Sequence, residues 1–250
     1  MKKLNVLIAC EYSGKIREAF RAKGHNAWSC DLLPSDDNSP YHYTGDCFNL
    51  LNDLEPDNPH FQNAFVGQSM PKWDLVIAHP PCTYLTNAGV CWLHKDSAKQ
   101  TAKERWVAMD EAAGFFASFI EFARNNPQVA VAIENPIMHK HAKQAISSFT
   151  AAGYQDQSQV IQPWMFGHPE SKATCLWLWG LPELFETDNV KELRDSLPQE
   201  QRQRLHWLPP TADRWKIRSE TFQGIADAMA QQWGEFLMAS KRADAQAVIS

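Results

Sequence analysis

Residues 73–82 read Trp73-Asp74-Leu75-Val76-Ile77-Ala78-His79-Pro80-Pro81-Cys82 and form the most informative stretch of the chain. The apolar run Leu75–Ala78 is too short for a helix but suits a buried strand of a parallel sheet. Two prolines then end the strand, because proline has no amide hydrogen for a neighbouring strand. We therefore expect Cys82 at the carboxyl edge of the sheet, where open α/β folds bind their ligands. Since free cysteine is also a common core residue, a structural thiol is the alternative.

Length and composition indicate an ordinary globular protein. The chain has 250 residues, which is enough for one well-buried domain and small for two. It is 44% hydrophobic and 21% charged, and no apolar stretch reaches the length of a membrane span. The first residues lack the apolar core and cleavage site of a signal peptide, so we expect a cytoplasmic protein.

The cysteines and the net charge exclude several classes of protein. No C-x-x-C pair occurs among Cys10, Cys30, Cys47, Cys82, Cys91 and Cys175. This argues against a zinc site and a disulfide framework, and we expect free thiols and no metal. The formal net charge of −5 gives no general attraction for nucleic acid, so such binding would need a local basic surface.

The first two-thirds of the chain alternates short apolar segments with helical ones, which is typical of βαβ units and an α/β fold. Strands are predicted at residues 4–9, 26–30, 75–78, 128–133, 159–162 and 174–179, and helices at 13–23, 101–124 and 221–238. Loops are predicted at 34–40 and 55–67, while 183–218 has no clean periodicity.

Acidic side chains follow several predicted strands. Cys10-Glu11-Tyr12-Ser13-Gly14 follows the first strand, Asp31 follows the second, and Asp46 lies in the next turn. Because a parallel sheet presents these ends along one edge, the order suits a nucleoside cofactor whose ribose hydroxyls bind a carboxylate. The single Gly14 does not make the G-x-G-x-x-G pattern of a dinucleotide site. Each acid alone is also an ordinary helix cap or loop residue.

Glu134-Asn135-Pro136 ends the predicted strand at 128–133, much as Pro80-Pro81-Cys82 ends the earlier one. A thiol and a carboxyl at one edge suit chemistry on a pyrimidine, in which the thiolate adds to carbon 6 and the carboxyl hydrogen-bonds nitrogen 3. Carbon 5 then becomes a nucleophile that takes an alkyl group. The alternative for Glu134 is a helix-capping acid. Enzymes that methylate exocyclic amines generally place Asp or Asn before Pro-Pro and an aromatic residue after it, so His79 and Cys82 at these positions favour carbon alkylation.

These motifs resemble those of the DNA cytosine-5 methyltransferases, particularly the compact forms encoded by bacteriophages, over most of the chain. The similar segments are 9–14, Asp31, Gly45-Asp46, Pro81-Cys82, Glu134-Asn135-Pro136, 167–174 and 219–226. The resemblance implies a Rossmann-like S-adenosylmethionine-dependent methyltransferase fold, a location in the cytoplasm of a bacterial host, and Cys82, Glu134 and Lys172 as catalytic residues. It also implies cofactor binding by Ala9, Glu11, Ser13, Gly14, Asp31, Asp46 and Pro80.

The chain departs from the family pattern at two segments. Glu11 and Ser13 stand where the family has glycines, and Lys172 and Thr174 stand where it has arginines. A lysine there offers a point charge instead of a planar fork. These departures leave open a cofactor with an extra carboxylate on the transferred carbon, which Lys15, Arg17 or Lys172 would pair with.

The carboxyl-terminal third is where we expect DNA contact. Residues 1–180 are predicted to form the catalytic cofactor-binding domain, 181–218 a small DNA-recognition lobe, and 219–250 a helix that returns to the catalytic domain. Between Lys191 and Arg218 there are seven basic and four acidic residues, a modest phosphate-binding signal whose alternative is a mixed solvated surface. We expect a monomer that binds DNA and does not associate with a membrane. It should flip its target base out of the stack.

Residues 83–100 are long enough to form a lid over an extruded base, with Tyr84, Trp92 and His94 to fill space around it. His79 and His94 are interpreted as structural. Two other functions stay open at this point. One is a non-catalytic nucleic-acid-binding module that keeps a cofactor pocket, and the other is an alkyltransferase that acts on free pyrimidine nucleotides or uses a carboxylated cofactor.

Overall fold

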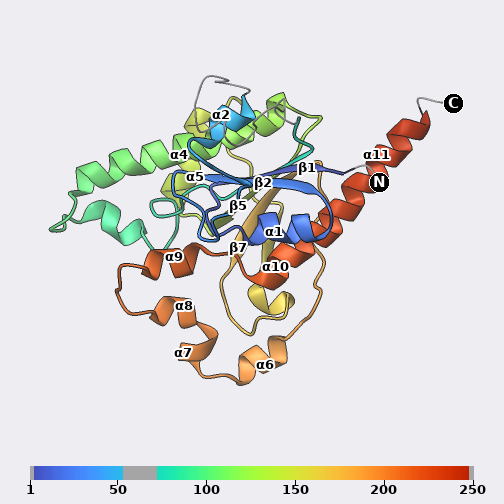
Figure 1. Ribbon diagram of the computed structural model, residues 1–250. Helices are drawn as coiled ribbons and strands as arrows, with labels where there is room; N and C mark the ends of the chain where they lie inside the picture. Colours follow the sequence, from blue (N-terminus) through green and yellow to red (C-terminus); the bar gives the residue numbers. More distant parts are fainter. Residues whose placement is uncertain (1–2, 53–71, 248–250) are drawn as a thin grey trace.

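The computed structural model describes residues 3–52 and 72–247, so the predicted loop at 55–67 lies outside the described residues. Within them, seven strands form one sheet in the order β3-β2-β1-β4-β5-β7-β6 (Figure 1). The strands are β1 (Asn5–Ala9), β2 (Asn26–Asp31), β3 (His42–Thr44), β4 (Leu75–Ala78), β5 (Ala130–Pro136), β6 (Gln159–Ile161) and β7 (Thr174–Trp179). The neighbours from β3 to β5 are parallel, and β7 is antiparallel to both β5 and β6. The predicted α/β fold with a mostly parallel sheet is confirmed.

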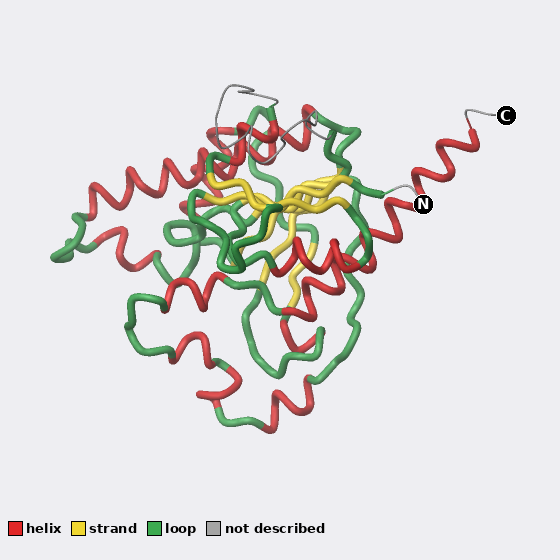
Figure 2. Tube along the Cα trace, in the orientation of Figure 1, coloured by secondary structure: helices red, strands yellow, loops and turns green. Residues whose placement is uncertain are grey.

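Helices cover both faces of the sheet (Figure 2). One face carries α2 (Cys47–Leu51), α4 (Ala102–Asn125) and α5 (Lys140–Phe149), and the other carries α1 (Lys15–Ala22), α10 (Gln223–Ala228) and the start of α11 (Gly234–Ala247). A π-helical turn, Met229–Trp233, joins α10 to α11. The helix predicted at 221–238 therefore begins later and continues further than the apolar pattern indicated, because the last turns of α11 extend beyond the core.

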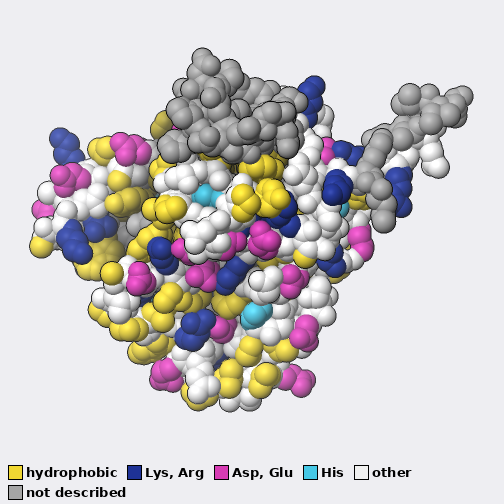
Figure 3. Space-filling view, in the orientation of Figure 1, with side chains coloured by type: hydrophobic (Ala, Val, Ile, Leu, Met, Phe, Trp, Pro, Cys, Tyr) yellow, Lys and Arg dark blue, Asp and Glu magenta, His cyan; other side chains and the backbone are white. Residues whose placement is uncertain are grey.

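Short helices make up the segment that showed no periodicity. They are α6 (Lys191–Ser196), α7 (Gln199–Arg202), α8 (Arg204–Trp207) and α9 (Arg214–Ser219). Helices of four to six residues are too short to establish a 3.6-residue pattern. Figure 3 shows acidic and basic side chains interspersed over this side of the molecule. In the described part of the chain, no helix has the length and apolarity needed to cross a membrane.

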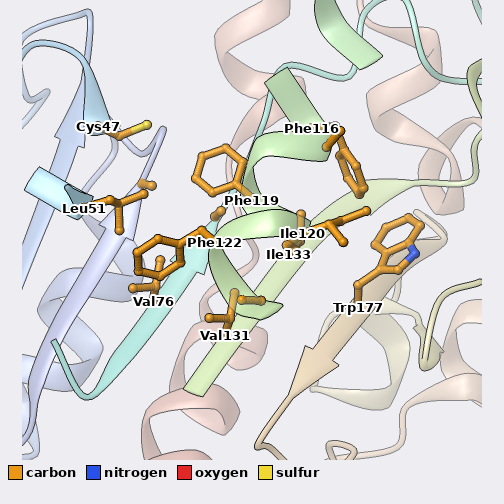
Figure 4. Packing of buried hydrophobic residues seen from close by; sticks show 14 of the residues in the cluster. Cys47, Leu51, Val76, Phe116, Phe119, Ile120, Phe122, Val131, Ile133 and Trp177 are labelled. Carbon is orange, nitrogen blue, oxygen red and sulfur yellow. The ribbon is translucent and has the colours of Figure 1, made fainter. Parts of the chain in front are cut away.

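Two hydrophobic cores lie on opposite faces of the sheet. Leu7 of β1 belongs to the core under α4 and α5, whereas its neighbour Ile8 belongs to the core under α1 and α10. Figure 4 shows α4 packing Phe116 against Trp177 of β7, with the ring centroids 5.0 Å apart in an edge-to-face arrangement. Because both faces are covered, β4 is apolar along its whole length.

The predicted end of one strand is wrong. The pattern predicted a strand at 128–133 with Glu134 beyond it, but β5 begins at Ala130 and continues through Pro136. The added residues pair with β7, in which Leu176 lies opposite Glu134 and Cys175 opposite Asn135. Glu134 therefore lies within a strand and is held by its pairing with β7 rather than by a turn.

Candidate active site

The candidate site lies at the carboxyl ends of β1, β4 and β5, where the strand order reverses between β1 and β4. The His79 amide donates a hydrogen bond of 2.9 Å to the Ala9 carbonyl. The Asn135 side-chain amide donates another, of 2.8 Å, to the Pro80 carbonyl. These two bonds hold the start of the Pro-Pro-Cys loop between the neighbouring strands, and they place Cys82 at this edge of the sheet.

Sheet register explains which side chains meet. Ala78 of β4 lies opposite Ile133 of β5. Continuing that register by one residue brings His79 beside Glu134. The His79 Nδ1 atom lies 3.0 Å from the Glu134 carboxylate, and the two side chains are 12% and 16% exposed. His79, interpreted from the sequence as structural, is thus in direct contact with a predicted catalytic residue.

Glu134 is an ionised carboxylate at neutral pH. Burial alone would raise its pKa, but the hydrogen bond and charge of His79, the charge of Lys172 and a hydrogen bond with Thr174 lower it below the ordinary value. An ionised Glu134 accepts hydrogen bonds, and it donates one only after it takes up a proton.

The pKa of the Cys82 thiol is shifted in the opposite direction. Burial and the charge of Glu134 raise the pKa of Cys82 above its ordinary value, while the charges of Lys172 and Arg218 oppose the rise. The free protein therefore holds Cys82 mainly as a thiol, and the two cations favour its reactive thiolate. Arg218 lies on α9, and its sequence context marks it only as one of the basic residues between Lys191 and Arg218. No local pattern could have found it, because α9 reaches the site through tertiary packing.

Tyr12, in the loop after β1, contacts helix α9. Its hydroxyl donates to the Lys216 carbonyl at 3.0 Å and lies 2.9 Å from the Ser219 hydroxyl. The Tyr12 ring also lies 5.7 Å from the ring of Trp215. These contacts hold α9 against the loop after β1 and bring Arg218 toward Cys82.

Three cations were predicted as partners for an extra cofactor carboxylate, and they differ in their surroundings. Lys15 forms an ion pair of 2.6 Å with the Glu220 carboxylate. Lys172 donates to the Glu220 carbonyl at 3.3 Å. Arg17 is fully buried, bonds the Ser29 hydroxyl at 2.6 Å and pairs with Glu18 and Asp37. Arg17 is therefore excluded as such a partner, which leaves Lys15 and Lys172.

The loop after β1 has two residues in the left-handed region, Cys10 with φ 60° and Gly14 with φ 72°. A side chain at Gly14 would overlap the Arg17 guanidinium, so glycine is required there. The Glu11 carboxylate accepts the Ile16 amide at 2.7 Å and the Arg17 amide at 3.3 Å. Glu11 thus binds the first turn of α1. Burial raises its pKa in spite of these bonds and the charge of His79.

The remaining predicted cofactor residues line the same edge. Ala9 ends β1 and is fully buried, Ser13 accepts the Lys15 amide at 3.5 Å, and Pro80 is buried. Asp31 accepts the Leu33 amide and Asp46 the Phe48 amide, each at 2.9 Å and each through Oδ1.

Burial raises the pKa of the Asp31 carboxyl, although hydrogen bonds from the Leu33 and Leu32 amides oppose the rise. The Gly45 amide donates to the Asp31 carbonyl at 2.9 Å and brings the two turns together. The two carboxylate acceptors, Asp31 and Asp46, fit the hydroxyls and the amine of a nucleoside.

The predicted lid residues pack beside the Cys82 loop. The His139 ring donates to the Tyr84 carbonyl at 2.9 Å, which ties the start of the connection to α5. His94 joins an aromatic cluster with Trp106 and His141, with ring centroids 5.6 and 5.9 Å away. This contact agrees with a structural role for His94. Trp92 is 46% exposed.

No protein-family model and no curated protein matches the chain. Solved structures with some likeness include a protein of an E. coli prophage described as a DNA modification methyltransferase, at 12% identity, a TM-score of 0.42, and coverage of 79% of this chain and 56% of that chain. The Entamoeba histolytica methyltransferase EhMeth has 14% identity, a TM-score of 0.39 and coverage of 76% and 58%. The S. pombe Dnmt2 methyltransferase has 16% identity, a TM-score of 0.35 and coverage of 86% and 62%.

All three descriptions name methyltransferases. This chain spans 56 to 62% of the length of those proteins. The fold class of the chain itself follows from its own strand order and pairing, which form a Rossmann-like α/β sheet.

Proposed function

We propose that this protein transfers a methyl group from an S-adenosylmethionine-type cofactor to carbon 5 of cytosine in DNA, through a covalent bond to Cys82. The observation that carries the proposal is the placement of Cys82 and Glu134. Cys82 follows β4 and Glu134 lies within β5, which is the parallel neighbour of β4. The two side chains are close enough for the charge of Glu134 to act on the thiol. The same edge holds the donors and acceptors of a nucleoside site.

In the proposed chemistry the Cys82 thiol first loses its proton to solvent, and the charges of Lys172 and Arg218 favour the thiolate that remains. Its sulfur bonds to carbon 6 of the base as the ring electrons shift toward nitrogen 3, to which Glu134 donates a hydrogen bond once it has taken up a proton. A bound S-adenosylmethionine supplies the methyl group for carbon 5. Loss of the proton on carbon 5 and release of the sulfur then restore the ring.

We assign the cofactor to the loop after β1 and the turns after β2 and β3. The Asp31 carboxylate suits the ribose hydroxyls, and the Asp46 carboxylate suits the adenine amine. Ala9, Ser13, Gly14 and Pro80 provide backbone and contact surface. Glu11 acts by shaping the loop, because both of its oxygens bind α1. For a cofactor with an extra carboxylate, Lys15 and Lys172 are the cations at hand, beside Glu220.

DNA contact is assigned to residues 181–218, with 1–180 as the catalytic part and 219–250 as the returning helix. Four of the seven basic residues pair with acids: Lys191, Arg194, Arg204 and Lys216. Among the described residues, Arg202, Arg214 and Arg218 form no ion pair with an acid. They stand near the exposed Trp207 and Trp215 in sequence. Arginines beside exposed aromatic rings suit a nucleic-acid surface.

Intact mass spectrometry tests the proposal. The protein is mixed with S-adenosylmethionine and a duplex that carries 5-fluorocytosine, whose fluorine blocks the final elimination. We expect a protein–DNA adduct that disappears in Cys82→Ala and persists in Cys91→Ser, since Cys91 is exposed and outside the site. The added mass identifies the transferred group.

Two other outcomes identify the rival functions. An adduct with 5-fluorocytidine nucleotides that duplex DNA does not compete away would indicate a nucleotide alkyltransferase. Binding of cofactor and DNA with no adduct over a wide set of duplexes would indicate a non-catalytic module.

A further inference from the structure

His79 is a titratable side chain, only 12% exposed, that contacts Glu134 and that the proposed chemistry leaves unused. Its Nδ1 atom contacts the Glu134 carboxylate at 3.0 Å, and its backbone amide is fixed to the Ala9 carbonyl. The other ring nitrogen, Nε2, is buried and has no hydrogen-bond partner in the described part of the chain. A buried ring nitrogen without a partner calls for an explanation, because leaving a polar atom unsatisfied costs about 1–3 kcal/mol.

The charges around His79 come from several elements. Glu134 approaches from β5, and the charge of His79 also acts on the fully buried Glu11 of the loop after β1. Lys172, before β7, acts on both Glu134 and Cys82, and Arg218 of α9 acts on Cys82. His79 therefore contacts the Glu134 carboxylate and acts through its charge on the buried Glu11, and it lies three residues before Cys82.

The proposed reaction needs a proton that Glu134 does not hold. Addition of sulfur to carbon 6 moves the electrons of the carbon 5–carbon 6 double bond toward carbon 4. The electrons of the carbon 4–nitrogen 3 bond then move onto nitrogen 3, which takes a proton. Glu134 is ionised in the free protein, so this proton must first reach it from another group.

We propose that His79 is a positioning residue that holds Glu134 and delivers a proton through it to nitrogen 3 of the base. This inference rests on the proposed function. Glu134 takes the Nδ1 proton of His79 and gives a proton to nitrogen 3, so the net transfer runs from His79 to the base. The imidazole must carry protons on both ring nitrogens beforehand, and it becomes neutral afterwards. When sulfur leaves, the proton returns by the same path.

Exchange of the hydrogen on carbon 5 tests this step without a cofactor. Addition of Cys82 lets carbon 5 take a solvent proton and lose its own, so a duplex with tritium at carbon 5 of cytosine releases it to water. His79→Asn retains an amide donor toward Glu134 but has no titrating proton. We expect tritium release to fall by about 100-fold, within the usual range for general acid catalysis. His25→Asn, at the opposite edge of the sheet, is the matched control and should exchange like the wild type.

The pH profile separates proton delivery from a structural effect. If His79 delivers the proton, the wild-type exchange rate should decline on the alkaline side of its profile, and His79→Asn should lack this alkaline limb. Release within threefold of the wild type, or slow release with an unchanged limb, would overturn the inference. The wild-type profile tests the inference even without the variant, because a wild-type rate with no alkaline decline would also overturn the role proposed for His79.

The fluorocytosine adduct keeps the two proposals apart. If the wild type forms the adduct and His79→Asn forms it at the same rate, only the role of His79 fails. If the wild type forms no adduct, the proposed function fails and this inference falls with it.

Discussion

The Asn135 side-chain amide donates a hydrogen bond of 2.8 Å to the Pro80 carbonyl. Pro80 lies one position past His79, and Asn135 lies one past Glu134, so this bond extends the β4–β5 register beyond the last backbone pair. Proline cannot provide an amide hydrogen for that purpose. The Asn135 side chain therefore provides a hydrogen bond between the two segments where the backbone pairing stops. This bond fixes the loop that carries Cys82.

Asn135→Ala should loosen this loop. We expect the rate of the Cys82 adduct to fall by about 10-fold to 100-fold, because small displacements of a reacting group have large effects on rate. The free energy of unfolding should fall by about 1–2 kcal/mol.

Asn126→Ala is the matched control for Asn135. It also removes a side-chain amide bond to a backbone carbonyl, in this case to Phe122 at 2.9 Å. A similar loss of stability with an unchanged adduct rate is expected. Equal adduct rates for the two variants would show that the Asn135 bond does not position the loop.

Arg218→Met should make the Cys82 thiol harder to ionise. Loss of this positive charge raises the Cys82 pKa further, so less thiolate is present at any pH below it. Alkylation by iodoacetamide, measured by peptide mass spectrometry at pH values from about 7 to 10 around the ordinary thiol range, should be slower at Cys82.

The background for this measurement is Cys91→Ser, because Cys91 is exposed and reacts on its own. Lys191→Met is the control, since Lys191 pairs with Asp195 on the surface of α6. An unchanged alkylation profile in Arg218→Met would mean that α9 does not act on the thiol.

Asp37→Asn should reduce stability at neutral pH and matter less in acid. Although partial burial opposes the effect, hydrogen bonds from Ser35 and Arg17 together with the charge of Arg17 lower the pKa of Asp37. A lowered folded-state pKa contributes stability above the unfolded value of about 3.9, and that contribution is lost as the pH falls through the folded value. Urea unfolding should therefore show a difference between wild type and variant at pH 7 that shrinks in the acid range below about pH 4.

Asp156→Asn provides the comparison for Asp37. It removes an ion pair with Lys143 in which the Asp156 side chain is 75% exposed, so its effect should stay within about 0.5 kcal/mol. A difference for Asp37→Asn that is constant with pH would contradict the assigned role of its charge beside the buried Arg17.

Gly224→Ala should be strongly destabilising. An added methyl group at Gly224 would overlap the Phe166 carbonyl oxygen, which forces the backbone of α10 away from the loop before β7. Gly114 in the middle of α4 has only ordinary contacts, at 3.7 Å or more from Phe149. Gly114→Ala should therefore stabilise the protein by about 0.5–1 kcal/mol, through helix propensity.

Thermal unfolding of the two glycine variants distinguishes these cases. The melting temperature should fall for Gly224→Ala and stay or rise for Gly114→Ala. A melting temperature for Gly224→Ala equal to that of the wild type would mean that α10 packs differently against residues 166–168.

Local patterns determined the parts of the protein whose physics is local. The apolar run before Pro80 predicted β4, since only a strand buried on both faces tolerates such a run, and the prolines located its end. The helix predicted at 101–124 is α4, whose first turn is closed by a capping box between Thr101 and Glu104, three residues apart in sequence. Asp31 and Asp46 lie at the sheet edge, as their positions in the sequence predicted, because Asp31 ends β2 and Asp46 comes two residues after β3.

Tertiary structure alone decided which of these groups meet. Glu134 lies within a strand because β7 pairs with it, and His79 touches Glu134 because two strands 55 residues apart share a register. Arg17 is withdrawn from the site by burial against Ser29 and Asp37, and Arg218 approaches Cys82 only when α9 docks on Tyr12. Contacts of this kind depend on pairing and packing between distant segments, and no periodicity within one segment encodes them.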